Sequence, residues 1–169
     1  MCQYLRNLRI LSAFAQFENM SNRRNLREAV LKALYAHQAG GGEASYIINN
    51  LIAPEAGDDK EALRFAENLF LKTLRSAPDF DDIIEPNLKN WELSRIALID
   101  KLVLRIAICE FLYFDDIPTK VTINEAIEVA KRYSTAKSGR FVNGILDVVR
   151  DQLTEEGKIS KTGRGLVDM

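Results

Sequence analysis

Apolar residues recur every three or four positions along most of this chain, which is the spacing of one face of an α-helix. Alternating strand patterns are scarce, so the pattern predicts an all-α fold. In the first half it predicts helices over 22–38 (capped by Ser21), 45–52 (closed by Pro54), 60–75 and 80–88 (broken by Pro86).

A longer element is expected from near Trp91 towards Phe114, with a division around Ile99 and Asp100. Between 102 and 112 it is apolar nearly all round, so it should be buried on most of its sides. This makes it the expected centre of the C-terminal half.

Two further helices are expected within 121–147. Thr122 and Glu125 have capping-box spacing at the start of the first. A small polar link leads to Ser138, which is expected to cap the second. Gly144 lies inside that second helix, where glycine costs roughly 1 kcal/mol relative to alanine. We expect it where another backbone approaches closely.

At 169 residues, one domain is the default. The predicted boundaries are an N-terminal extension over 1–20, an all-α domain over 21–153 and a flexible tail over 154–169, so both termini are expected to be flexible. The domain should divide into sub-bundles of about 21–80 and 81–153. Met20 could be the natural start, with the preceding residues an upstream extension from a misassigned start; a genuine extra helix is the other interpretation.

Composition excludes several classes of protein. The two cysteines, Cys2 and Cys109, lie far apart, which favours a reducing cytoplasmic setting, with Cys109 a small core residue. A single histidine, His37, excludes His-based metal sites, and no phosphate-binding loop follows the glycines at 40–42. No apolar run reaches the roughly 18–20 residues that span a membrane. We therefore expect no membrane association, no cofactor, no metal and no enzymatic activity.

Charge placement is more informative than the formal net charge of −1. Arg23, Arg24 and Arg27 share one face in the first turns of the first helix. Cations there oppose the helix dipole, at about 0.3–1 kcal/mol each. A phosphate backbone would reverse that cost, while an ordinary solvated face is the alternative. Glu110 is a lone acid in the apolar helix; an ion pair with Lys131 or Arg132 is the simplest expectation.

Three blocks of sequence, in the same order and at the same spacing, resemble the NusB family. They are RRNLREAVLKALYAHQ (23–38), the segment 84–113 with its NW and LRIA…E elements, and the segment 116–147 with INEA and FVNG. The resemblance implies two packed three-helix sub-bundles. It also implies a transcription antitermination factor that binds boxA RNA of ribosomal RNA transcripts together with NusE, within the antitermination complex of RNA polymerase.

The resemblance also implies roles for individual residues. Arg23, Arg24 and Arg27 match the family's RNA-contacting arginines. Tyr35 and Glu110 match positions associated with the surface for NusE and RNA. Asp147 matches an acid near the RNA face, where it would tune affinity by repulsion.

Some alternatives stay open at this point. One is a NusB-like accessory domain of the kind found in ribosomal RNA cytosine methyltransferases, although no methyl-donor motif is present. Another is a helical scaffold that binds only protein. The resemblance leaves a monomer and a homodimer both open.

Overall fold

The structure, a computed structural model, describes residues 22–88 and 92–166. These residues form helices and no strand, which confirms the all-α prediction. The first described helix runs over 22–40. Its expected cap, Ser21, and the proposed extension over 1–20 lie outside the described residues.

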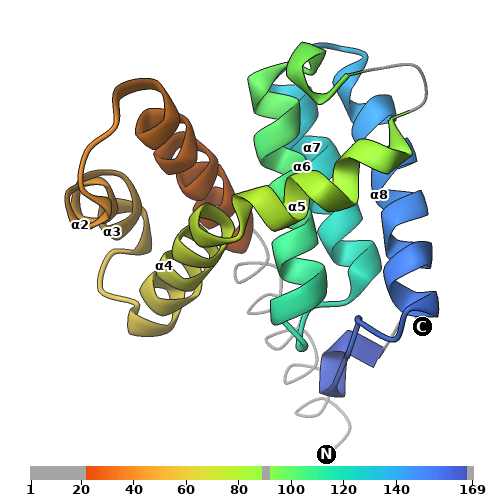
Figure 1. The fold of residues 1–169 in the computed structure, drawn as a ribbon. Coiled ribbons are helices and arrows are strands. Elements are labelled where there is room, and N and C mark those ends of the chain that lie inside the picture. The colour runs from red at the N-terminus through yellow and green to blue at the C-terminus, as the bar shows by residue number, and fades with distance from the viewer. Residues whose placement is uncertain (1–21, 89–91, 167–169) are drawn as a thin grey trace, which may run out of the picture.

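The helices that follow form two groups (Figure 1). Beside the first helix lie α2 (Ala44–Ile47), a π-helical turn (Ile48–Ile52), α3 (Ala53–Ala56) and α4 (Lys60–Arg75). The second group contains α5 (Ala77–Ile84), a 3₁₀ turn (Glu85–Asn87), a second 3₁₀ turn (Leu93–Arg95), α6 (Leu98–Tyr113), α7 (Thr119–Tyr133) and α8 (Ser138–Glu155). Figure 1 shows α5 crossing α6, with α7 and α8 behind and beside it.

The helix α6 is the centre of the molecule, as its apolar sequence predicted. It packs against α4, α5, α7 and α8, and Leu104, Ile108, Cys109 and Phe111 on it are fully buried. One continuous apolar core runs through both groups of helices. The helix begins at Leu98, after the extended residues Ile96 and Ala97, so the expected division at Ile99 and Asp100 is slightly misplaced.

Local capping rules succeeded in one place and failed in others. Asp59 caps α4 as an acid should, accepting hydrogen bonds from the backbone of Glu61 and Ala62 at 2.9 and 3.0 Å. Pro54, by contrast, does not close the second helical segment. It lies in the first turn of α3, directly after the π turn, where a missing N–H is tolerated.

The expected caps of α7 and α8 are also wrong. Thr122 lies inside α7, whose N-cap is Pro118. Ser138 is the first residue of α8, and its hydroxyl donates instead to the buried carboxylate of Asp100, at 2.9 Å. This bond ties the link between α7 and α8 to the start of α6.

Close packing of α8 occurs at a different glycine from the one expected. A Cβ on Gly144 would meet nothing within 4 Å, so no neighbour requires glycine there. A Cβ on Gly139 would lie 3.0 Å from the Cγ of Lys131. The tight approach of α8 to α7 is therefore at the start of α8.

The chain after α8 does not form the flexible tail that was expected; up to residue 166 it packs against the rest of the protein. Beyond α8 the chain returns to the loop between α6 and α7 and ends in a 3₁₀ turn (Gly163–Leu166) (Figure 1). Ile159 and Lys161 are buried, and the backbone N–H of Thr162 donates to the carbonyl of Asp115 at 3.0 Å. The sequence missed this because single anchoring residues create no periodic pattern.

Candidate nucleic-acid interface

The three arginines of the first helix differ in how far they reach solvent. The side chains of Arg23 and Arg24 are 32% and 43% exposed, whereas that of Arg27 is only 6% exposed. All three face acidic side chains from the second group of helices. The shared face predicted from their spacing is therefore also the contact between the first helix and the helices α6 and α7.

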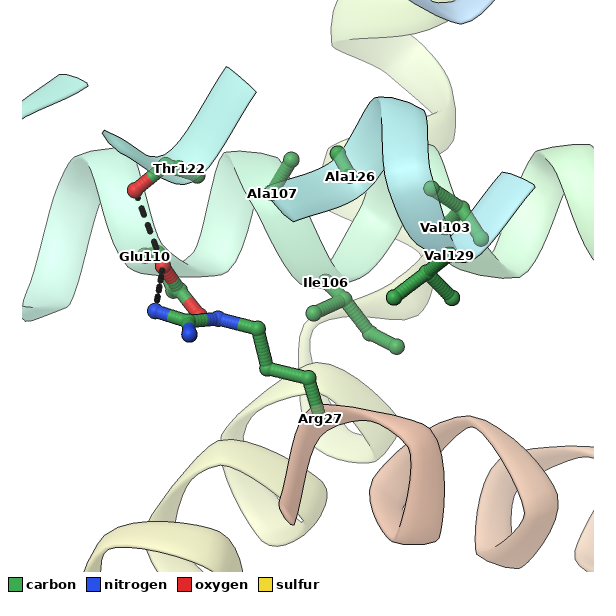
Figure 2. Close-up of a pocket in the computed structure, with 8 residues that line it drawn as sticks. All are labelled: Arg27, Val103, Ile106, Ala107, Glu110, Thr122, Ala126 and Val129. Atoms are coloured by element: carbon green, nitrogen blue, oxygen red, sulfur yellow. Dashed lines mark hydrogen bonds and ion pairs between the residues drawn. The ribbon is translucent and has the colours of Figure 1, made fainter. Parts of the chain in front are cut away.

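Arg27 forms a two-point ion pair with Glu110 of α6 (Figure 2). Its Nε donates to Oε1 at 2.6 Å and its Nη2 to Oε2 at 3.1 Å, and the hydroxyl of Thr122 donates to Oε2 at 2.8 Å. Burial alone would lower the pKa of Arg27, but the charge and hydrogen bonds of Glu110 raise it above its ordinary value. Both carboxylate oxygens of Glu110 therefore accept hydrogen bonds within this buried pair.

The partner of Glu110 is thus not the one expected. Lys131 pairs with Glu128 of its own helix, and Arg132 pairs with Glu28 of the first helix. Both cations come from the last turn of α7, whereas Glu110 faces Thr122 near its start.

Arg24 is held by the residue that was expected to complete a capping box. Its Nε and Nη2 donate to the two carboxylate oxygens of Glu125, at 2.9 and 2.7 Å. This hydrogen bonding is the main reason that the pKa of Arg24 is raised. Glu125 is buried, so the pair anchors the first helix on α7 while the arginine side chain stays partly exposed.

Arg23 is the least constrained of the three. Its Nη1 lies 3.4 Å from Oδ2 of Asp116, whose side chain is half exposed. The guanidinium also lies 4.9 Å from the ring centre of Phe65 on α4, a cation–π distance. A loose, exposed ion pair of this kind contributes little and can be exchanged for a phosphate.

A second contact that the sequence did not reveal fixes the first helix further along. Glu28 accepts hydrogen bonds from Arg132 at 2.8 Å and from the hydroxyl of Tyr133 at 2.6 Å. The sequence carried this contact only as charge, with an acid, Glu28, on the first helix and a cation, Arg132, near the end of α7. Sequence spacing offers no rule for choosing that pair.

The space beside the buried pair is too small for a ligand. A cavity of about 10 Å³ lies between Arg27, Glu110 and apolar side chains of α6 and α7 (Figure 2), room for about one water molecule. Within the described residues no group of three His, Cys, Asp or Glu side chains could hold a metal ion. No described helix is long and apolar enough to cross a membrane.

A family model described as the NusB family matches residues 24–151, which include Arg24, Arg27 and their partners on α6 and α7. The chain belongs to the NusB family. It is 46% identical over 150 residues to the transcription antitermination protein NusB of Salinibacter ruber, covering 89% of this chain and 94% of that protein. It is 43% identical over 148 residues to the protein of the same name from Chloroherpeton thalassium, covering 88% of this chain and 70% of that protein.

Solved NusB structures share the fold. The structure of T. maritima NusB has a TM-score of 0.70 and 40% identity, and the match covers 77% of this chain and 91% of that one. A crystal structure of the antitermination factors NusB and NusE in complex with dsRNA also has a TM-score of 0.70. Its identity is 22%, over 79% of this chain and 98% of that one, so it is a likeness of fold.

The remaining residues implicated by the NusB resemblance lie apart from the buried pair. Tyr35, three helical turns beyond Arg24, is 45% exposed and accessible to a partner. Asp147 on α8 is 43% exposed; it accepts a hydrogen bond from Asn143 at 3.1 Å and pairs with Arg150 at 3.2 Å. These partners are all on α8, and none is an arginine of the first helix. The roles of Tyr35 and Asp147 stay predictions.

Two of the predicted contact residues are buried in this conformation. Glu110 has 1% of its side chain exposed and Arg27 has 6%, so neither reaches a partner directly while the pair is closed. A direct contact with RNA or protein stays a prediction for them, and it would require the pair to open. Arg23 and Arg24 are the members of the set that solvent, and therefore a phosphate, can reach.

Proposed function

We propose that this chain is a non-catalytic transcription antitermination factor that binds boxA-type RNA of ribosomal RNA transcripts together with NusE. The observation that carries the proposal is membership of the NusB family over residues 24–151, including a relative named for transcription antitermination that is 46% identical over nearly its whole length. The action proposed is within the antitermination complex of RNA polymerase, in the cytoplasm.

The geometry supports different roles for the three arginines of the first helix. Arg23 and Arg24 present partly exposed guanidinium groups, while Arg27 is used internally. A phosphate can take the place of the distant, exposed Asp116 beside Arg23 at small cost. Arg24 can bind a phosphate through the exposed part of its side chain while Glu125 fixes its orientation.

The partnership with NusE is extended to this chain from a solved neighbour, which contains NusB and NusE in complex with dsRNA. Tyr35 supports it as an exposed aromatic side chain on the helix that carries the arginines. Exposed tyrosines are enriched where proteins contact one another. In this proposal NusE and the first helix together form the surface for RNA.

The test is the binding of labelled boxA RNA to the full chain, with and without NusE, over a series of salt concentrations. Weak, salt-sensitive binding is expected for the chain alone, and tighter binding with NusE. A scrambled RNA of the same composition is the control for sequence. If boxA RNA with NusE bound no better than the scrambled RNA, the proposed function would be wrong.

A further inference from the structure

A groove of about 570 Å³ opens beside Arg23, between the start of the first helix, α4 and the C-terminal segment. Three arginines line it, Arg23, Arg64 and Arg164, together with the ring of Phe65. The arginines come from three distant parts of the sequence. Arg164 lies well beyond the 24–151 region that matches the family model, and Arg23 lies just before it.

Three carboxylates also line this groove, so the partners of each charged side chain decide what the groove can bind. Asp59 is occupied as the cap of α4, and Asp116 is occupied by Arg23. Glu61 is exposed. Arg64 and Arg164 are exposed too, and among the described residues neither has an ion pair or a hydrogen bond from its side chain. Its three arginines and three carboxylates cancel in formal charge, so the case for an anion rests on position. Arg64 and Arg164 have no partner for their guanidinium groups among the described residues, and they line the same groove as Arg23.

The position of Arg164 is fixed by contacts that its neighbours make with the end of α6 and the loop after it. Lys161, just before it, donates from Nζ to the carbonyl oxygens of Glu110 and Phe114, at 3.0 and 2.9 Å. Both carbonyls lie at the C-terminal end of α6, where the helix dipole favours a cation, and each also accepts a backbone N–H, from Phe114 and from Ile117. The N–H of Thr162 bonds to Asp115, so the segment is anchored on the corner that carries Glu110.

Two glycines complete this anchorage. Gly163 has a φ of +53°, which favours glycine. At Gly165 a Cβ would collide with the backbone carbonyl oxygen of Asp115, so only glycine lets the segment lie this close. Arg164 stands between them, on a short stretch held by its neighbours rather than on a free tail.

We propose that Arg164 is an RNA-phosphate contact and that the C-terminal segment, residues 156–166, extends the RNA-binding face of Arg23 and Arg24 across this groove. The inference rests on the proposed function and adds a binding residue to it. Arg64, on the same groove, is placed to contact a neighbouring phosphate. Because the contact is with the backbone, it adds affinity for RNA without adding sequence preference.

The experiment compares the full chain with its Arg164→Ala variant, in complex with NusE and labelled boxA RNA, over a salt series. Losing one phosphate contact to single-stranded RNA should lower the slope of log affinity against log salt by about 0.7. At low salt the affinity should fall several-fold, and equally for boxA and scrambled RNA. The matched control is Lys158→Ala, which removes an exposed cation of the same segment that is paired with Glu156 and does not line the groove.

A second variant tests the anchorage. Gly165→Ala keeps Arg164 but places a Cβ against Asp115, so it should reproduce the loss seen with Arg164→Ala if the fixed position matters. Circular dichroism melting of each variant shows whether it is folded, and Arg164→Ala, an exposed substitution, should melt with the wild type.

The outcomes separate this inference from the function on which it rests. If the wild type shows no preference for boxA RNA, the proposed function and the inference fall together. If the wild type binds boxA RNA and Arg164→Ala binds with the same affinity and slope, only the inference is overturned. An Arg164→Ala variant that loses affinity for NusE alone, with RNA binding unchanged, would also overturn it.

Discussion

The side chains of Arg27 and Glu110 are joined by two parallel hydrogen bonds, of 2.6 and 3.1 Å, at a buried position between the first helix and α6. They are 83 residues apart in the sequence. The pair links the helix that carries the exposed arginines to the centre of the fold, so its first consequence is for stability and for the placement of Arg23 and Arg24.

Removing either partner alone should therefore destabilise the protein strongly. Arg27→Ala or Glu110→Ala leaves a buried charge without its partner, which typically costs about 3–5 kcal/mol. Denaturant unfolding followed by circular dichroism measures this loss. The double variant Arg27→Met with Glu110→Leu should recover most of the stability, because it leaves no isolated charge.

The control for that prediction is the ion pair of Arg105 and Asp81, which has the same two-point geometry but is more exposed, at 12% and 23% of the side chains. Arg105→Ala should cost less than Arg27→Ala because water reaches the remaining carboxylate. Equal losses at the two sites would contradict the claim that burial makes the Arg27 pair more costly to break.

The free energy of unfolding at alkaline pH should depend on the burial of Cys109. Burial raises the pKa of its thiol to about 12, whereas a thiol in an unfolded chain ionises near pH 9. Between these values the unfolded state binds fewer protons than the folded state, so the stability that Cys109 contributes falls as pH rises. The difference in unfolding free energy between wild type and Cys109→Ala should shrink by up to about 1.4 kcal/mol per pH unit from pH 9 to 11. A difference that is constant with pH would show that the thiol is not protected by burial.

Asp147 is predicted to weaken RNA binding by repulsion. Asp147→Asn should raise the affinity for boxA RNA at low salt by a few-fold, with a gain that fades as salt screens the charge. Asp151→Asn is the matched control, because both aspartates pair with Arg150 on α8. Equal effects of the two substitutions would show that Asp147 has no special place on the RNA face.

The helices that sequence reasoning located well are those whose local signals agree with their packing. The helix α4 was expected over 60–75 and is found there, because Asp59 caps it and one apolar face meets the core. The burial of α6 followed from a segment that is apolar all round. In such segments the apolar residues, spaced three or four positions apart, are the residues that make the tertiary contact.

The errors arise where a side chain has a distant partner. Thr122 and Glu125 have the spacing of a capping box, but in the structure they bond to Glu110 and to Arg24. The carboxylate of Glu125 meets an arginine 101 residues away, which no rule based on local spacing can find. The same limit hid the partner of Glu110.

The arginine cluster shows how far the candidate site could be predicted. Its location on the first helix followed from spacing and from the resemblance, but the three side chains are not equivalent. Whether an arginine faces solvent or a buried acid depends on α6 and α7, which come some 80 to 100 residues later. Exposure is therefore what the structure added to the sequence.

The most direct test of this account is the salt dependence of boxA RNA binding by the variant Arg23→Ala with Arg24→Gln, in the presence of NusE. Glutamine keeps a hydrogen-bond donor for Glu125 while removing the charge. Arg95→Ala is the control, since Arg95 is an exposed arginine beyond the opposite end of α6 from Glu110. If Arg23 and Arg24 are the RNA contacts, the slope of log affinity against log salt should fall by about 1.4 for two single-stranded phosphates, with Arg95→Ala unchanged. A folded double variant with the slope and affinity of the wild type would contradict the account.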